Sequence, residues 1–511
     1  MRPDIIVVGA GTAGCVVARR LFDAGLTVRL VEAGPGEPRP EAVLGADPVA
    51  AAEVPDRQWP GLLAAATDGA PGHRYRQGYG IGGGSAINAM ILSPGDDADY
   101  RRWADQHGCA EWGPADLAPW IDRVTATWPT ETVPPGPVTR AFVQAAAEAG
   151  HPVGGDTLEP GVLGVLETRL SLSGDRRVSS FDQLIKPAID GRDGNRLQVL
   201  TGRHVTRILT DGDRPAGVVL DDGTELAATR VAVCGGAVRT PQLLLASGIG
   251  RPSVGRTLRD HPSYAFTVQL RPGTSADRSV SGPVSRLLRW SSGDGDGDGG
   301  DADLQAFVIE RVDTPDPPDT LDKAGHRADI PDGHRRADRT QYAVVVVGLM
   351  DVSSVGRTVP GQTAGQPSII TGALDTEHDR RRLRAGVRHV NGLLDSPPMA
   401  AVVEQVYLDD RGTSADELPL MPDDRLDRML LANPGPYSHP VATCPMGPAA
   451  DPAAVVSDAV ADGGMVHGHR GVHVIDASIM PNLVRGGLQL PVTAVAERLA
   501  AALVTRFADD G

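Results

Sequence analysis

The stretch Ile5-Ile6-Val7-Val8-Gly9-Ala10-Gly11-Thr12-Ala13-Gly14 decides the fold prediction. Its first four residues form a continuous apolar run, which is typical of a strand buried on both faces of a parallel sheet. The glycines that follow have the spacing Gly-x-Gly-x-x-Gly, and residues 15–24 then carry apolar side chains at helical spacing. Gly25 ends this helix, and residues 27–31 form a second strand. The first 35 residues therefore predict one βαβ unit.

The glycines of this loop have the roles that binding of a dinucleotide requires. Gly9 permits the tight turn, Gly11 lets a pyrophosphate approach the backbone, and Gly14 allows close packing of helix on strand. The helix N-terminus supplies free N–H groups and a partial positive charge. Glu32, at the end of the second strand, would accept hydrogen bonds from the ribose hydroxyls, which disfavours NADP. The alternative is a glycine-rich turn without a ligand, and this motif alone does not separate FAD from NAD.

The composition is that of an ordinary globular protein. The chain has 511 residues and a formal net charge of −16, with 41% hydrophobic and 22% charged residues. Such a chain can bury a large core, and its length suggests two to four domains. Disorder, collagen and coiled coil are excluded as overall classes. The acidic balance disfavours binding of nucleic acid, which needs a basic surface.

The four cysteines, Cys15, Cys109, Cys234 and Cys444, lie far apart and form no CxxC pair. A disulfide framework or a zinc site is therefore not expected, and a reducing compartment is the default. The N-terminus has no charged leader followed by an apolar segment, and no apolar run reaches the length of a bilayer span. We therefore expect a soluble, cytoplasmic protein.

The rest of the chain continues in the same style. Further strands are expected at residues 197–200, 205–209, 216–220, 230–234, 305–310, 342–348 and 471–476, and helices from Thr240 and from about Pro491. Residues 291–303 and 313–339 are rich in Gly, Asp, Pro or Arg and are expected to be flexible excursions from a domain. A second glycine match at 78–83 follows no buried strand, so it is interpreted as a loop whose bare backbone packs against a flat ligand.

Later motifs resemble those of the GMC (glucose–methanol–choline) oxidoreductases. Gly82-Gly83-Gly84-Ser85-Ala86-Ile87-Asn88-Ala89-Met90, with Gly95 and Asp99-Tyr100-x-x-Trp103, is similar to the first family signature. Residues 235–250, beginning Gly-Gly-Ala-x-x-Thr-Pro-Gln, are similar to the second. Residues 254–262, 438–447 and 466–481 resemble further family segments in the family's order.

This resemblance implies an α/β fold in two domains. A discontinuous doubly wound FAD-binding domain of Rossmann type would comprise residues 1–120, 190–262 and 435–511. A substrate-binding domain, built on an antiparallel sheet with helices, would comprise residues 121–189 and 263–434. Ile87 stands where some family members carry a histidine that bonds to the flavin, so the resemblance implies non-covalent FAD.

The resemblance also implies a set of cofactor-binding residues. They are Gly9, Gly11, Thr12, Ala13, Gly14, Glu32, Gly83, Ser85, Asn88, Val205, Asp476, Ala477, Gln489 and Pro491. The helix after Gln489-Leu490-Pro491 would point its positive N-terminus at the N1–C2=O edge of the flavin, where it would stabilise the anionic reduced form.

His439 matches the base of the family, which removes the hydroxyl proton while a hydride passes to flavin N5. A neutral imidazole suits this task because its pKa lies near working pH. The alternative is a buried structural histidine. The position of the usual second His or Asn falls on Gly487, so Gln489 or a residue of the substrate-binding domain would have to supply the missing contact. His439 and Gln489 are the catalytic candidates.

Other suggestive patterns receive structural interpretations. No metal is expected at His467-x-His469-x-x-x-His473, nor at the acidic run 294–305, whose twelfth position is Gln305 rather than glutamate. Asp260-His261-Pro262 is interpreted as the start of a helix or a domain junction, and Cys444 as a packing residue.

The function expected from the resemblance is FAD-dependent oxidation of a primary or secondary alcohol, a small-molecule substrate. Oxygen, a quinone or another redox carrier would take the electrons. The alternatives are a flavin-containing enzyme that resembles hydroxynitrile lyases, a non-catalytic FAD-binding protein and an NAD-dependent dehydrogenase. The sequence predicts neither the particular alcohol nor the oligomeric state.

Overall fold

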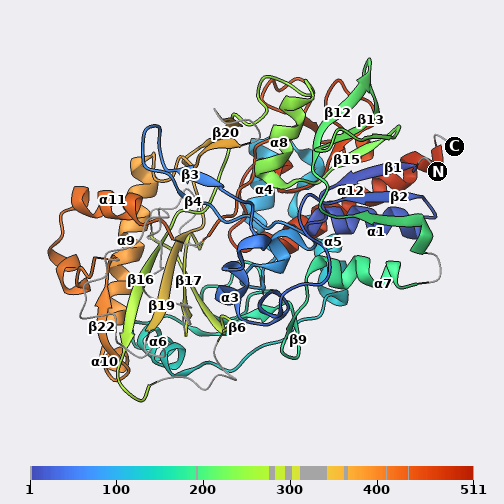
Figure 1. Cartoon of the computed structure of the whole chain (residues 1–511). Coiled ribbons are helices and arrows are strands. Elements are labelled where there is room, and N and C mark those ends of the chain that lie inside the picture. Colours follow the sequence, from blue (N-terminus) through green and yellow to red (C-terminus); the bar gives the residue numbers. More distant parts are fainter. Residues whose placement is uncertain are drawn as a thin grey trace.

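The computed structural model describes residues 3–191, 194–274, 282–293, 302–310, 342–361, 366–409, 411–435 and 437–509 (Figure 1). Of the two expected excursions, residues 294–301 and all of 313–339 lie outside the described residues.

A five-stranded parallel sheet forms the first half of the fold. Its order is β11-β2-β1-β15-β25, with bounds Leu197–Leu200, Val28–Val31, Ile5–Val8, Val231–Val233 and Val472–Val474. All four residues of β1 are buried, as the continuous apolar run predicted. The strands come from three distant parts of the chain, which confirms the α/β fold of Rossmann type and its discontinuous character.

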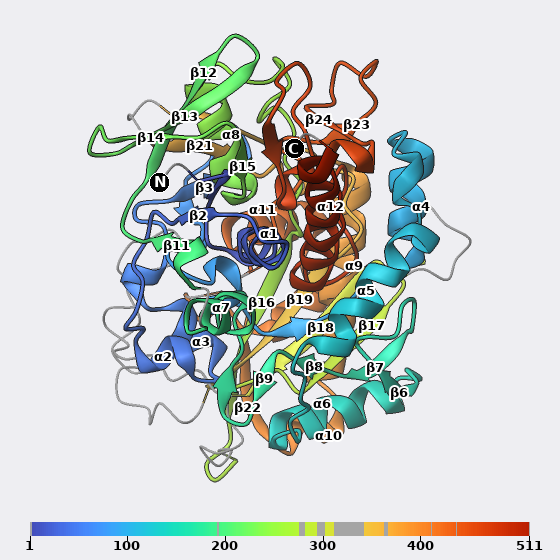
Figure 2. The same cartoon turned by 90° about the vertical axis from the view of Figure 1, so that its right-hand side faces the viewer.

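Two long helices pack side by side on this sheet. The N-terminal helix α1 (Thr12–Asp23) lies against α12 (Gln489–Asp509), and Figure 2 shows both at the front of the molecule. Arg20 on α1 forms an ion pair of 2.7 Å with Glu497 on α12. Helix α8 (Gly236–Ala246) follows β15. The N-terminal and C-terminal helices are thus joined in one layered unit.

A seven-stranded sheet forms the second half. Its order is β22-β16-β19-β18-β17-β7-β6, with bounds Val403–Tyr407, Ser263–Leu270, Tyr342–Leu349, Leu304–Ile309, Arg286–Trp290, Gly164–Glu167 and Val153–Asp156. Every pair is antiparallel except β6 with β7. Helix α9 (Glu377–Leu394) packs along β19 and β18 (Figure 1). The antiparallel sheet with helices matches the architecture expected for the second domain, whose exact boundaries stay a prediction.

Smaller elements connect and flank the two sheets. One four-stranded sheet has the order β20-β21-β3-β4 (Arg357–Pro360, Pro367–Ile370, Leu63–Ala65, His73–Arg74), and a three-stranded sheet has the order β12-β13-β14 (Val205–Asp211, Arg214–Leu220, Glu225–Ala227). The remaining helices are α2 (Glu41–Leu44), α3 (Pro48–Ala52), α4 (Asp97–Gln106), α5 (Pro114–Thr127), α6 (Pro137–Glu148), α7 (Lys186–Ile189), α10 (Pro397–Ala400) and α11 (Asp423–Ala432). The remaining strands are β5 (Ile91–Leu92), β8 (Arg169–Leu170), β9 (Leu172–Ser173), β10 (Arg176–Arg177), β23 (Met446–Gly447) and β24 (Val456–Ser457).

Two helices begin earlier than the sequence predicted. Helix α8 starts at Gly236 rather than Thr240, because a glycine pair gives no apolar period that would reveal the first turn. Helix α12 starts at Gln489, which places Pro491 in the first turn, where its missing N–H is not needed. Among the described helices, none combines the length and the apolar character that crossing a bilayer requires.

Candidate active site

A cavity of about 500 Å³ lies where the strands of the parallel sheet end and continues to the seven-stranded sheet. Val8, Val31 and Val233, the last residues of β1, β2 and β15, line it. From the other side it is lined by residues of β17 and β18, including Arg289 and Gln305. Ligands of open α/β sheets bind at this end of the strands, so the cavity is the candidate site.

The glycine loop forms one wall of the cavity by close approach of backbones. Gly9 has φ +101°, and a Cβ atom there would lie 2.5 Å from the carbonyl oxygen of Cys234. A Cβ atom on Gly14 would lie 1.8 Å from the carbonyl oxygen of Gly9, so only glycine allows α1 to pack this close. A Cβ atom on Gly83 would lie 2.7 Å from Cα of Gly11, which brings the two glycine loops together at the cavity.

Glu32 lies at the cavity, and three backbone groups hold its carboxylate. Its Oε2 accepts the N–H of Ala10 at 2.8 Å, and its Oε1 accepts those of Gly34 at 2.8 Å and Gly80 at 3.1 Å. A carboxylate has about four acceptor positions, so one remains for a ribose hydroxyl. The bonds also tie the end of β2 to both glycine loops.

Three helices direct their N-termini at this cavity. Residues from the first turns of α1, α8 and α12 line it, among them Thr12, Ala13, Ala237, Gln489 and Val492. Each N-terminus carries unpaired N–H groups and about half a positive charge. Their convergence creates a site for an anionic group such as a diphosphate.

Asp476 and Ala477 follow β25 and line the same cavity. The Asp476 carboxylate accepts the backbone N–H of Gly236 at 2.8 Å, the hydroxyl of Thr240 at 2.5 Å and the N–H of Ser478 at 2.8 Å. Burial raises its pKa. Asp476 therefore fixes the start of α8 against the loop after β25.

The second glycine loop and the start of α12 meet through side chains. Asn88 donates from Nδ2 to Oε1 of Gln489 at 2.7 Å, and its own Oδ1 accepts from Arg177 at 2.8 Å. The Nε2 group of Gln489 is buried at the cavity and has no partner in the described residues. The hydroxyl of Ser85 is satisfied within the protein, by the carbonyl of Gly82 and the N–H of Ser180. Gln489 therefore offers a donor to a bound group, whereas Ser85 contributes its backbone.

These features fit FAD. The side-chain-free loops and the N-terminus of α1 suit a diphosphate, Glu32 suits a ribose, and the N-terminus of α12 with the unpaired amide of Gln489 suits a flavin carbonyl. Most of the expected cofactor residues line the cavity, Val205 at the start of β12 included, but Gly14 and Pro491 do not. Gly14 serves helix packing, and Pro491 is buried in the first turn of α12.

His439 lines the cavity on a segment that is held at many points. Ser438 before it has φ +98° and Ala442 after it has φ +67°, both in the left-handed region. The N–H of His439 donates to Oδ1 of Asp260 at 2.7 Å. Val441 pairs with Arg259 through two backbone hydrogen bonds. Strained backbone that the surroundings hold in place is typical of functional sites.

Asp260 and His261 lie beside His439. No helix starts at these residues, which corrects the first of the two sequence-based interpretations, whereas the domain junction stays a prediction. They precede strand β16, and Nδ1 of His261 lies 3.1 Å from Nδ1 of His439. Oδ1 of Asp260 also accepts the N–H of His261 at 2.8 Å, while the hydroxyl of Tyr75 donates to Oδ2. Burial raises the pKa of Asp260 to about 6 and lowers that of His439 to about 4. His439 is therefore neutral at neutral pH and can accept a proton, but its pKa lies below the near-neutral value expected from the sequence, so it is a weaker base than an exposed histidine.

Gly487 lines the cavity without offering a side chain. A Cβ atom there would lie 3.0 Å from the carbonyl oxygen of Ile91, so the backbone is already packed against β5. The polar side chains near His439 come from elsewhere. Tyr437 packs edge-on at 5.2 Å between ring centroids, and its hydroxyl accepts a hydrogen bond from Nε2 of Gln305.

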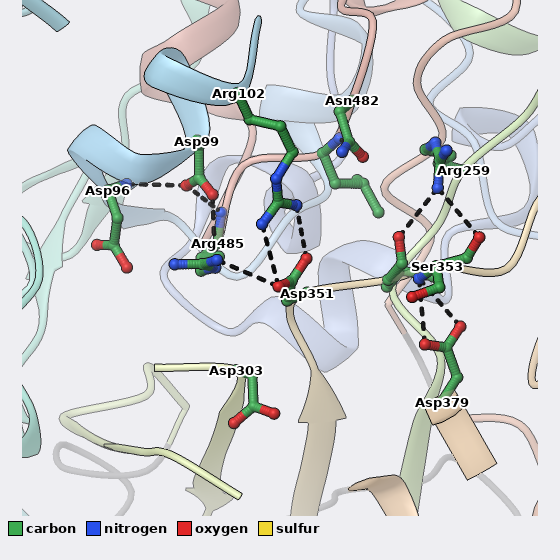
Figure 3. A network of polar contacts seen from close by, with 12 residues as sticks. Asp96, Asp99, Arg102, Arg259, Asp303, Asp351, Ser353, Asp379, Asn482 and Arg485 are labelled. Atoms are coloured by element: carbon green, nitrogen blue, oxygen red, sulfur yellow. Dashed lines mark hydrogen bonds and ion pairs between the residues drawn. The ribbon is translucent and has the colours of Figure 1, made fainter. Parts of the chain in front are cut away.

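A buried network of charges supports the loop that carries Gly487 (Figure 3). Arg485 donates from Nη2 to Asp351 at 3.1 Å, and its backbone N–H donates to Asp99 at 2.8 Å. Asp351 also accepts from Arg102 at 2.6 Å, and these arginines hold its pKa well below its usual range. The network joins α4, the end of β19 and the loop before α12. It therefore holds in place the part of the cavity wall that contains Gly487.

The other patterns have local partners. His467 and His473 contact the carbonyl oxygens of Gly447 and Gly463, each at 3.0 Å, and His469 accepts the N–H of Gly250 at 3.3 Å. Within the described residues, no group of three or more metal-binding side chains is present. Cys444 is fully buried, and burial raises the pKa of its thiol well above the ordinary value.

Known proteins share this fold and sequence over nearly the whole chain. Oxygen-dependent choline dehydrogenase of Burkholderia mallei is 28% identical over 551 residues, covering 97% of this chain and 93% of the relative. Pyridoxine 4-oxidase from Mesorbium loti superimposes with a TM-score of 0.80 at 25% identity, covering 98% of both chains. A formate oxidase variant from Aspergillus oryzae shares the fold, with a TM-score of 0.81 at 20% identity over 99% of both chains.

Two family models match separate parts of the chain. The N-terminal model of GMC oxidoreductase matches residues 3–263, and the C-terminal model matches residues 357–496. The match confirms the resemblance found in the sequence motifs. The chain belongs to the GMC oxidoreductase family and is an FAD-dependent oxidoreductase.

Proposed function

We propose that this protein oxidises a primary or secondary alcohol, with His439 as the base. The observation that carries the proposal is a neutral, partly buried imidazole that lines the cavity, on a segment held in strained geometry. FAD would supply the acceptor of the hydride, and Ile87, which stands where some family members carry a flavin-linked histidine, would leave it bound non-covalently. His439 takes the hydroxyl proton of the substrate, for which a positioned base gives about 10²- to 10⁴-fold in rate.

The substrate oxygen needs a second contact because Gly487 offers none. Two groups at the cavity can supply it: the Nε2 group of Gln489 and the hydroxyl of Tyr437. Tyr437 accepts from Gln305, so its own proton is available to the substrate oxygen. The arrangement orients the alcohol with protein groups that come from both halves of the fold.

The chemistry of the cavity favours an uncharged substrate. Its far end is lined by Val284, Leu287, Phe307 and Ile309, together with Arg289. The carboxylates that line the described part of the cavity are Glu32, Glu53 and Asp476, and the first and last serve the expected adenosine and diphosphate positions. Glu53 pairs with Arg74 and Arg76. A cation such as choline, the substrate named for the bacterial relative, would meet no unpaired carboxylate among the residues that line the described part of the cavity, where Arg289 is itself paired with Asp96.

The test is an anaerobic panel of neutral primary and secondary alcohols, with choline alongside, followed through the visible absorbance of the bound flavin. We expect a neutral alcohol to bleach the flavin faster than choline, and oxygen or a quinone to restore the colour. Release of cyanide from a cyanohydrin with the flavin still oxidised would instead show a lyase. A flavin that no alcohol reduces would contradict the proposal and favour a non-catalytic FAD-binding protein.

A further inference from the structure

We propose that His261 is a positioning residue that fixes the tautomer of His439, so that the Nε2 lone pair of His439 faces the cavity. This inference rests on the proposed function, because it concerns the base of that reaction. His261 is 3% exposed and does not line the cavity, whereas His439 does. His261 therefore acts on the reaction only through its neighbour.

The contact between the rings requires one donor and one acceptor. The two Nδ1 atoms are 3.1 Å apart, and the rings meet edge-on with an interplanar angle of 79°. Each neutral imidazole carries one proton, on either Nδ1 or Nε2. Burial and the mutual repulsion of the rings lower the pKa of His261 far below its ordinary value, and burial lowers that of His439. At neutral pH, one Nδ1 must therefore donate and the other must accept.

The proposed role of His439 as the base decides the direction. Nδ1 of His439 faces His261, so only its Nε2 is left to take the hydroxyl proton of the substrate, and that nitrogen must carry a lone pair. The proton of His439 then lies on Nδ1, and the proton of His261 lies on its own buried Nε2. Its Nδ1 then accepts, Nδ1 of His439 donates, and Nε2 of His439 is left with a lone pair for the substrate hydroxyl.

Other groups around the pair support this arrangement. Asp260 accepts the backbone N–H of both histidines through one oxygen, which holds the two main chains in register. Tyr75 donates to the other oxygen of Asp260. Tyr437 packs edge-on against both rings. The protein therefore fixes the relative orientation of His261 and His439 before a substrate binds.

Two substitutions separate positioning from simple packing. In His261→Asn, Oδ1 can occupy the place of the imidazole Nδ1 and accept from His439. In His261→Leu, a side chain of similar bulk offers no acceptor. His151→Asn is the matched control, because His151 contacts His389 at a different surface and lies outside the cavity.

The variants are compared as FAD-loaded proteins in the anaerobic reduction assay. We expect His261→Leu to keep its flavin spectrum and KM but to lose about 10- to 100-fold in the limiting rate constant, as is common for groups that orient an imidazole. His261→Asn should recover most of that loss, and His151→Asn should match the original protein. The pH at which the rate constant of flavin reduction falls off on the acid side should shift in His261→Leu. In His261→Asn it should lie where it does in the original protein. A folded, yellow His261→Leu with the original rate, or a His261→Asn as slow as His261→Leu, would overturn the proposal.

A second measurement stays informative if no alcohol is oxidised. Ring-¹⁵N-labelled histidine, with signals assigned from His439→Ala and His261→Leu, reports which nitrogen carries the proton. We expect His439 protonated on Nδ1 in the original protein. A proton on Nε2 of His439 would overturn the positioning role, whereas failure of the alcohol panel alone would overturn only the proposed function.

Discussion

Replacing Asp260 by asparagine tests the electrostatics at the base of the site. Asp260 is partly buried, and its pKa of about 6 lies roughly 2 units above that of an exposed carboxylate. The folded state therefore binds this proton more tightly than the unfolded state does, so the stability contribution of Asp260 is largest at low pH. That contribution is lost as pH rises towards 6 and amounts to about 3 kcal/mol, of which about 2 kcal/mol falls between pH 4.5 and 7.5. Asp260→Asn keeps an acceptor for the two histidine N–H groups but cannot ionise.

The assay is the melting temperature of the variant and of the original protein at both pH values. Unfolding of 511 residues carries an entropy of about 1.1 kcal/mol per degree, so 2 kcal/mol corresponds to about 2 °C. We expect the difference in melting temperature between Asp260→Asn and the original protein to be about 2 °C more favourable to the variant at pH 7.5 than at pH 4.5. Asp105→Asn, at an exposed position of α4, should show no such difference. A difference of the opposite sign, or equal differences at both pH values, would refute the reasoning.

Two further predictions address packing and charge. Arg289 and Asp96 form a 2.6 Å ion pair in which each side chain is 5% exposed. Thermal unfolding of Arg289→Met should therefore show a loss of stability of about 3–5 kcal/mol, because the carboxylate of Asp96 is left buried and unpaired. Arg428→Met, at an exposed ion pair, is the control and should cost less than about 1 kcal/mol. Gly14→Ala should yield protein without bound FAD, because its Cβ atom would lie 1.8 Å from a backbone oxygen. Gly392→Ala is the control, because a Cβ atom at this position of α9 meets open space. It should keep the flavin absorbance and gain up to about 1 kcal/mol of stability. A yellow, stable Gly14→Ala would contradict the packing argument.

Local signals allowed the dinucleotide-binding half to be predicted from sequence. A buried strand, three glycines and an acidic residue lie within the first 32 residues, and the structure places them around one cavity wall. The reason is that close approach of backbones restricts residue type strongly, as the 1.8 Å distance at Gly14 shows. Such restrictions leave a pattern that a single sequence displays.

The partner of His439 could not be predicted in the same way. His261 is 178 positions away in the chain, and its motif carried no signal of contact with the later segment. The pairing arises because Arg259 and Val441 form a backbone bridge that brings the two loops together. Long-range register of this kind depends on the whole fold.

The sequence shows that Gly487 stands at the position of the family's second His or Asn. It does not show which residues surround Gly487. The tight contact with Ile91 and the polar pair Tyr437–Gln305 emerge only when β5 and β18 are placed at the cavity. Gln489 was expected near the flavin, and the structure gives it a fixed partner in Asn88 and an unpaired donor group. The individual roles of these residues stay predictions.

The most direct test of the account compares FAD-loaded His439→Ala with the original protein in anaerobic single-turnover reduction by the best alcohol of the panel. Both proteins should be equally yellow, since His439 does not hold the cofactor, and the variant should reduce its flavin about 10²- to 10⁴-fold more slowly. A yellow His439→Ala that is reduced at the original rate would contradict the assignment of the base.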